Sequence, residues 1–342
     1  MPKPPPTRRG DSQATGDSSN GTVPDSTAAQ AKAEVKRRKP RTVLSPTVTY
    51  RGSISPPSVP LPRELAEGVK QLQEAMGMPV WMLLQTGNMK PDTLDYSVLR
   101  SFLGVREQLA ADGHVALLVD SPGGLGDVAY QMARILQRDG GFTVVIPRYA
   151  KSAATLLSLG AHRAIMGEDA EIGPLDAQLW DAEREEPGSA LNEVQALDQL
   201  HTVALEHLDK TMMTMLGGTK KRTDVLLPLA AKFVSDMMRP MLEKIDAVHY
   251  AKQSRILAVA EHYAIRLICL SGVPREEARE IADTLVNRYP EHGFVIDRQE
   301  VEDLRLLRLV EPADDVREAV ARVERALWRC DITTFGKLEE HS

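Results

Sequence analysis

Two short turns near the middle of the chain carry residue types that can do chemistry on a carbonyl group. The first turn is Ser121-Pro122-Gly123-Gly124, and the second is centred on Ser152. A serine at the N-terminal end of a helix lies near free N–H groups and the positive end of the helix dipole. Paired glycines let backbone N–H groups point into a crevice with no Cβ in the way, where they can stabilise an oxyanion. Together the two turns indicate acyl chemistry with a serine nucleophile.

Each turn also has a purely structural interpretation. A serine at this position is commonly an N-cap, and a Gly-Gly pair commonly marks a tight turn. Both turns within one strand-helix-strand unit are less expected by chance, which favours the catalytic interpretation. In that interpretation the N–H of Ala153, directly after the serine, is the second oxyanion donor beside Gly123 or Gly124.

Apolar runs of strand length precede both turns and determine where they lie. Val115 to Val119 precedes the first turn, Phe142 to Ile146 precedes the second, and each turn opens a helical pattern. Short buried strands that alternate with helices are typical of βαβ units in a largely parallel sheet, so the expected fold class is α/β. Right-handed crossovers place both turns at one edge of that sheet, where open α/β sheets bind ligands.

The order of these motifs resembles a known superfamily. Ser-Pro-Gly-Gly after a strand, then Ala-Lys-Ser-Ala-Ala about thirty residues later, is similar to the Clp protease/crotonase fold. Within it the chain most resembles the serine dehydrogenase proteinase family, related to signal peptide peptidase A. Residues 170–176 and 289–296 are also similar to that family, and the resemblance covers roughly Val80 to Val310.

The resemblance implies a function and a set of site residues. It implies a serine-type endopeptidase that hydrolyses peptide bonds in peptide or protein substrates, works as a homo-oligomer, and uses no cofactor and no metal. Ser152 takes the nucleophile position, and Gly123 or Gly124 with Ala153 takes the oxyanion-hole positions.

The general base departs from the Clp pattern. The Clp protease proteolytic subunit carries a histidine downstream of its serine, but here that region holds Leu175 and Asp176. The relation to signal peptide peptidase A implies a lysine base instead, because burial can lower the pKa of a lysine towards neutrality. Lys210 is the candidate base, and Asp176 is a possible orienting residue.

Other interpretations of the base stay open. Lys210 can instead form a solvated i,i+4 pair with Glu206. His207 shares a helix face with Lys210, and His292 lies in the family-like C-terminal stretch, so both histidines remain candidates. Lys151 adjoins Ser152, but successive helical residues project in different directions, so Lys151 is expected at the rim of the crevice.

The composition divides the chain into four parts. Residues 1–60 hold ten of the 22 prolines and a single aromatic residue, which predicts a disordered tail. Residues 61–180 are expected to form the Clp/crotonase-like α/β core with the nucleophile. Residues 181–330 are expected to be a mainly helical continuation and extension, and residues 331–342 a loose C-terminus.

The charge balance and the apolar runs restrict partners and location. The tail has ten Lys and Arg against four Asp and Glu, so with a whole-chain charge of −6 the remainder carries −12. An acidic body argues against nucleic-acid binding outside the basic tail. No apolar run has the length of a membrane span, no apolar leader is present, and two cysteines indicate no disulfide framework, so we expect a cytoplasmic protein.

Two other functions fit parts of this pattern. The unassigned base leaves open a non-catalytic assembly or scaffold protein with a Clp-like fold. A crotonase-like acyl-CoA enzyme also uses a backbone oxyanion hole, but that chemistry does not require a serine after Lys151.

Overall fold

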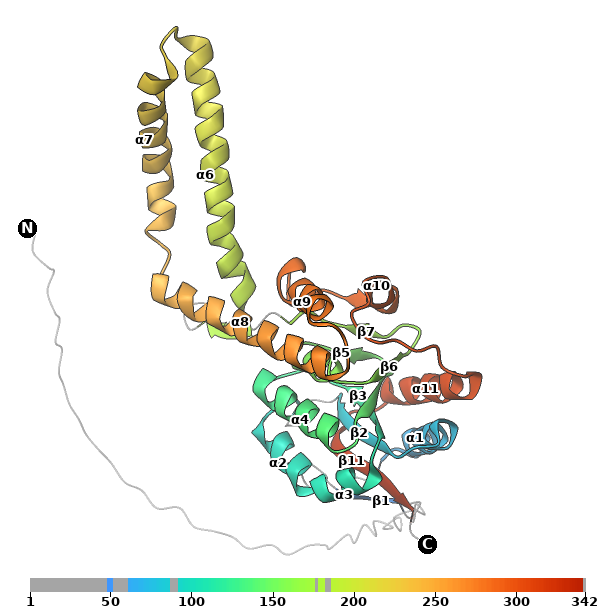
Figure 1. The fold of residues 1–342 in the computed structure, drawn as a ribbon. Helices are drawn as coiled ribbons and strands as arrows, with labels where there is room; N and C mark the ends of the chain where they lie inside the picture. The colour runs from blue at the N-terminus through green and yellow to red at the C-terminus, as the bar shows by residue number, and fades with distance from the viewer. Residues whose placement is uncertain (1–47, 52–60, 87–91, 176–177, 182–185, 341–342) are drawn as a thin grey trace, which may run out of the picture. The chain divides into compact units, whose positions relative to one another are not determined.

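The protein is built on a mixed sheet whose central strands are parallel (Figure 1). The computed structural model describes residues 48–51, 61–86, 92–175, 178–181 and 186–340. The parallel strands, in spatial and chain order, are β2 (Val80–Gln85), β3 (Val115–Asp120), β4 (Phe142–Ile146) and β6 (Arg163–Met166). Strand β11 (Thr333–Glu340) pairs antiparallel with β2, and β1 (Val48–Arg51) pairs antiparallel with β11.

The central strands are buried on both faces, which explains their continuous apolar sequences. Every residue of β2, β3 and β4 is buried. Alternate side chains enter two separate cores: Trp81 and Leu117 belong to one, whereas Met82 and Leu118 belong to the other. This alternation is the two-residue period of a strand.

Helices cover each face of the sheet. The core that contains Trp81 is closed by α2 (Tyr96–Gly104), α4 (Gly126–Arg138), α5 (Ala153–Ser158) and α8 (Ala247–Leu270). The opposite core is closed by α1 (Arg63–Met76) and α11 (Asp314–Leu327), which lie side by side in Figure 1. Helix α3 (Arg106–Asp112) leads from α2 into β3.

A small second sheet links the segment before Ser152 to a segment near residue 290. Its strands are β10 (Ile296–Asp297), β7 (Glu171–Ile172) and β5 (Tyr149–Ala150), in that order. Strand β5 runs directly into the Ser152 turn. Helix α9 (Arg275–Asp283), the π-helical turn η1 (Thr284–Arg288) and α10 (Arg298–Asp303) surround β10 in the sequence.

Two long helices form a hairpin, and in the sequence they lie between the core strands and α8. They are α6 (Ala190–Gly218) and α7 (Thr223–Leu242), and they follow the antiparallel pair β8 (Gln178–Asp181) and β9 (Glu186–Ser189). The hairpin helices pack through a small cluster whose buried members are Met212, Leu226 and Ala230. Among the helices of the described ranges, none has the length and apolarity needed to cross a bilayer.

The structure confirms the α/β class with a helical C-terminal region, and it corrects one boundary. Residues 331–342 were expected to be loose, but 333–340 form β11, in which Phe335 is fully buried against Trp81. The sheet therefore draws on sequence from both sides of residue 180. The predicted disordered tail, residues 1–60, lies outside the described residues except for β1.

Candidate active site

The two turns predicted to carry the chemistry are in direct contact. The N–H of Ser121 donates to the Tyr149 carbonyl at 3.1 Å, and the N–H of Lys151 donates to the Ser121 carbonyl at 3.0 Å. These bonds form a parallel bridge between Ser121 and Ala150. The predicted meeting of the two turns at one edge of the sheet is therefore confirmed.

Only glycine fits at the two positions between the turns. Gly123 has φ 99°, and a Cβ added there would lie 2.5 Å from the Lys151 carbonyl oxygen and 2.9 Å from the Ala153 nitrogen. Gly124 has φ 145°, and a Cβ there would collide with the backbone of Leu94. The doublet thus allows two stretches of backbone to approach it from opposite sides.

The extended segment at Leu94 fixes the glycine doublet from its far side. The N–H of Leu94 donates to the Gly123 carbonyl at 2.6 Å, and the N–H of Leu125 donates to the Leu94 carbonyl at 2.7 Å. Next to it, the Asp95 carboxylate caps α2 by accepting from the N–H groups of Ser97 and Val98. The doublet is therefore held by backbone hydrogen bonds as well as by close packing.

Ser152 has a backbone conformation that side chains rarely adopt. Its φ is 50° and its ψ is −118°, the values of the first central residue of a type II′ turn, where glycine is usual. Such a conformation costs about 1–3 kcal/mol for a residue with a side chain. Ser152 stands at the N-cap position of α5, but its hydroxyl makes no capping hydrogen bond. The N-cap interpretation therefore does not explain why a serine occupies this position.

Ser152 opens onto a cavity of about 710 Å³. Gly124 and Ala153 line the same cavity, so three of the predicted site residues meet there. Helix α8 forms one wall, and its lining residues share one helix face: Arg255, Ile256, Val259, Ala260 and Tyr263. Leu125, Leu156 and Leu175 make much of the remaining lining apolar.

The predicted oxyanion donors divide into two roles. The Gly123 N–H donates to the Ser121 hydroxyl at 3.1 Å, and that hydroxyl donates to the Gln85 side chain at 2.6 Å. Gly123 therefore uses its amide to hold the turn together. Gly124 and Ala153 line the cavity together with Ser152, so their N–H groups remain the candidate oxyanion donors.

The structure does not bring the predicted lysine base to Ser152 within one chain. Lys210 lies twenty residues beyond the start of α6, or about 30 Å along the helix axis. Its side chain is 71% exposed and forms the i,i+4 pair with Glu206, at 3.3 Å. Lys151 is bound by the Ile172 carbonyl at 3.1 Å and the Glu171 carboxylate at 2.8 Å. The predicted orienting residue Asp176 lies outside the described residues.

His292 supplies an imidazole to the cavity wall. It lies between Tyr289 and Phe294, whose rings pack with centroids 5.0 Å apart. The Tyr289 hydroxyl donates to Glu300 at 3.1 Å, and burial followed by this bond raises the pKa of Tyr289. The antiparallel pairing of β10 with β7 and the parallel pairing of β7 with β5 connect this segment to the turn that carries Ser152.

A buried ion pair fixes the strand ends from which the two turns start. Arg148 donates two hydrogen bonds to the Asp120 carboxylate, at 2.7 and 2.8 Å. Its guanidinium also donates to the Leu327 carbonyl and stacks over the Trp328 ring at 4.6 Å. Burial raises the pKa of Asp120, and the hydrogen bonds from Arg148 oppose that shift. Sequence patterns alone do not predict this pair, although Asp120 is the only charged residue of an otherwise apolar strand.

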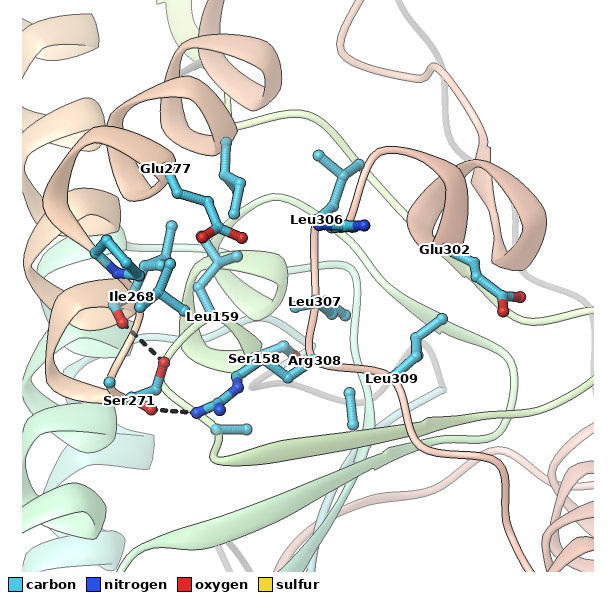
Figure 2. A pocket seen from close by; sticks show the side chains of 17 residues that line it. Ser158, Leu159, Ile268, Ser271, Glu277, Glu302, Leu306, Leu307, Arg308 and Leu309 are labelled. Atoms are coloured by element: carbon cyan, nitrogen blue, oxygen red, sulfur yellow. Dashed lines mark hydrogen bonds between the residues drawn. The ribbon is translucent and has the colours of Figure 1, made fainter.

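A second cavity lies at the opposite end of α5 (Figure 2). It measures about 400 Å³, and Ser158, Ile268 and Leu307 contribute to its lining. The Ser158 hydroxyl donates to the Ala154 carbonyl at 2.8 Å, inside the helix. Arg308 donates to the Ser271 carbonyl, as the dashed line in Figure 2 shows. The second serine of the lining, Ser271, donates its hydroxyl hydrogen to the Ile268 carbonyl at 2.8 Å, so both serine hydroxyls of this cavity are bound to backbone carbonyls.

The match to a family model covers both turns. Residues 75–215 match the model of the ClpP-like SDH-type serine proteinase family. The family resemblance read from the sequence is therefore confirmed.

Three individual proteins are similar to the chain over larger or smaller parts. Protein MJ0137 of Methanocaldococcus jannaschii is 42% identical over 69 residues, which cover 20% of this chain and 24% of that protein. A mutant of the 1510-N membrane-bound stomatin-specific protease with a substrate peptide overlaps 70% of this chain and 77% of its own, at 12% identity and TM-score 0.40. A ClpP1 mutant from Listeria monocytogenes overlaps 71% of this chain and 98% of its own, at 12% identity and TM-score 0.34. The chain thus spans about a quarter of the curated relative.

Proposed function

We propose that this protein is a serine-type peptidase in which Ser152 is the nucleophile. The observation that carries the proposal is the strained Ser152, which lines one cavity together with Gly124 and Ala153. Strain of this kind persists where surrounding structure enforces it, and it is common at active sites. The family match supports the same reaction class, since residues 75–215 contain both turns.

A peptide bond can be hydrolysed at this cavity by a series of steps in which every proton and every bond is accounted for. The Ser152 oxygen attacks the carbonyl carbon of a peptide bond while its proton passes to a base. The N–H groups of Gly124 and Ala153 donate to the oxygen that becomes negative in the tetrahedral intermediate. The protonated base then gives its proton to the leaving amine, and water hydrolyses the acyl-enzyme by the same steps.

His292 is the base that we propose. It is the only imidazole that lines this cavity in the described part of the chain. A neutral imidazole accepts a proton and returns it near neutral pH, which the reaction requires. Lys210 could serve only from a neighbouring subunit, because its own chain keeps it exposed on α6.

The lining of the cavity supports a substrate with an apolar side chain. Leu125 and Val259 are exposed large apolar residues of the cavity lining, and Leu156 is a buried residue of the same lining. An extended peptide beside Gly124 would place alternate side chains towards this lining. The homo-oligomeric state and the cytoplasmic location implied by the sequence remain part of the proposal.

Labelling with a fluorophosphonate probe tests the nucleophile. We expect the wild-type chain and Ser158→Ala to be labelled, and Ser152→Ala to lose both labelling and cleavage of an unfolded protein substrate. Ser158 is the matched control, because it lies on the same helix and lines a cavity of its own. Labelling that survives in Ser152→Ala would assign the nucleophile elsewhere. A wild-type chain with neither labelling nor cleavage would favour the scaffold alternative.

A further inference from the structure

Helix α8 presents one charged side chain to the cavity beside Ser152. The α8 residues that line the cavity are apolar or aromatic except Arg255, whose side chain also reaches solvent. Within the described residues, Arg255 is the only Lys or Arg in that lining. Because an arginine stays protonated at any working pH, the cavity has one permanent positive charge on a wall that is otherwise apolar.

The guanidinium of Arg255 has most of its hydrogen-bond donors unused. Its Nε donates to the Ala251 carbonyl in the same helix, at 3.1 Å. Across the part of the chain that the structure describes, the two terminal nitrogens of Arg255 make no hydrogen bond and no ion pair. A guanidinium presents these nitrogens in the planar arrangement that binds a carboxylate through two parallel hydrogen bonds.

The acidic residue of the same lining has partners of its own. Asp127 is the only Asp or Glu among the described lining residues, and its carboxylate accepts from the Tyr96 hydroxyl at 2.5 Å. Asp127 also lies in the first turn of α4, where the N–H groups of the helix stabilise a negative charge. The positive charge of Arg255 therefore remains available to a ligand.

Helix α8 is fixed against α4, so the position of Arg255 along the cavity wall is defined. The rings of Tyr263 and Tyr130 stack with their centroids 4.1 Å apart. Val259 and Arg255 lie one and two turns before Tyr263, on the same face of α8. Arg255 is therefore about 6 Å from Val259 along the helix axis, at 1.5 Å per residue.

This separation is close to the side-chain spacing of an extended peptide. Side chains two residues apart in a strand point to the same side and lie about 6.6–6.8 Å apart. A peptide that runs along α8 with an apolar side chain at Val259 brings the side chain two residues away to Arg255.

We propose that Arg255 is a specificity-determining residue that binds an acidic side chain of the substrate, two residues from the apolar side chain. The preferred substrate is then a peptide with a Glu or Asp at that spacing. This specificity rests on the proposed peptidase function, because the peptide occupies the cavity of Ser152.

Peptide binding to a chain without the nucleophile tests the contact. Fluorescence anisotropy with Ser152→Ala gives dissociation constants for amidated peptides that differ only in Glu or Gln, placed two residues before or after a single leucine. We expect the Glu peptide to bind about tenfold more tightly than the Gln peptide in one of the two positions. Adding Arg255→Gln should remove that difference.

Arg266→Gln is the matched control, because Arg266 is an exposed arginine of the same helix that lies outside this lining. It should keep the tenfold difference between the Glu and Gln peptides. Equal dissociation constants at both positions, no binding of any peptide, or a preference that survives Arg255→Gln would each overturn the proposal.

Reversal of the charge gives a sign change that lost packing would not produce. With Arg255→Glu in the Ser152→Ala chain, a peptide with Lys at the same position should bind about tenfold more tightly than the Glu peptide. A variant that still binds the Glu peptide more tightly would show that Arg255 does not contact this side chain.

The C-terminus of a peptide is the other source of a carboxylate. A peptide that ends two residues after the leucine carries its terminal carboxylate on the backbone, whereas the Glu side chain extends towards the wall. We therefore expect the amidated Glu peptide to bind more tightly than this shorter peptide. The opposite order, lost in Arg255→Gln, would assign Arg255 to chain ends and overturn the preference for an internal acid.

Cleavage of the same peptides by the wild-type chain separates this inference from the peptidase proposal. We expect kcat/KM to be about tenfold higher for the Glu peptide than for the Gln peptide. Cleavage of both at equal kcat/KM would overturn the specificity and leave the peptidase. A Glu preference in binding to Ser152→Ala, with no cleavage by the wild-type chain, would leave the role of Arg255 and overturn the peptidase.

Discussion

The two ends of helix α5 each place a serine beside a cavity, yet only one end is arranged for chemistry. Ser158 is helical, and its hydroxyl donates to the carbonyl of the preceding turn at 2.8 Å. Ser152 has a positive φ, makes no capping bond and faces a glycine doublet across a backbone bridge. The comparison teaches that neither residue type nor a nearby cavity defines the site. What distinguishes the proposed site is the positive-φ backbone of Ser152, whose hydroxyl makes no capping bond and which lies beside the glycine doublet.

The largest expected effect distinguishes His292 from Lys210 as the general base. His292→Ala should lower kcat/KM by about 10²–10⁴-fold, the usual contribution of general acid–base catalysis. Lys210→Ala should leave kcat/KM within about twofold, because the pair with Glu206 is exposed. Steady-state kinetics on a peptide substrate measures both. A large loss in Lys210→Ala with little loss in His292→Ala would return the role to Lys210 across subunits.

The next effect concerns the close contact between the turns. Gly123→Ala should reduce both activity and stability, because the added Cβ would lie 2.5 Å from the Lys151 carbonyl oxygen at φ 99°. Positive φ alone costs an alanine about 1–3 kcal/mol, and the contact adds to it. Gly104→Ala is the control, because its Cβ would meet nothing within 4 Å. Urea unfolding gives the two free energies, and equal values would show that the turns do not approach this closely.

Substitution of either serine by glycine should change the free energy of unfolding by a smaller amount, with opposite signs at the two ends of α5. Ser152→Gly should raise the free energy of unfolding by about 1–3 kcal/mol, since glycine accepts φ 50° without strain. Ser158→Gly should lower it by about 0.5–1 kcal/mol, because glycine is unfavourable inside a helix. Thermal unfolding checks the two signs. A Ser152→Gly variant that is less stable than wild type would show that the backbone of Ser152 is not strained.

The smallest effect is a pH dependence at the Ser158 end of the helix. Burial, helped by the nearby charges of His114 and Arg308, lowers the pKa of His162. The folded state therefore binds the proton less readily than the unfolded state, so stability is retained above about pH 6.5, the ordinary value, and is lost as the pH falls below it. His162→Gln should lose less stability than wild type between pH 7 and pH 5 in urea unfolding. Identical slopes would exclude His162 as the cause.

Local sequence patterns were sufficient to predict the arrangement of the two turns. Apolar runs such as Val115 to Val119 specify the parallel strands, and the handedness of the crossovers then brings Ser152 to the glycine doublet. The N-cap alternative was equally local, and only the backbone angles of Ser152 decide against it.

The remaining parts of the site depend on contacts between distant segments. Lys210 had a plausible helix position, but sequence spacing does not show that α6 carries it about 30 Å from its first residue. His292 reaches the cavity through the pairing of β10 with β7 and of β7 with β5. Strand β11 had local strand formers in Thr333, Thr334 and Phe335, and the charged residues after them obscured that signal.

The most direct test is a crystal structure of the fluorophosphonate adduct. The account predicts phosphorus bonded to the Ser152 oxygen, with the phosphonyl oxygen about 2.7–3.1 Å from the nitrogens of both Gly124 and Ala153. An adduct on another residue, or a phosphonyl oxygen that faces solvent away from these two amides, would contradict it.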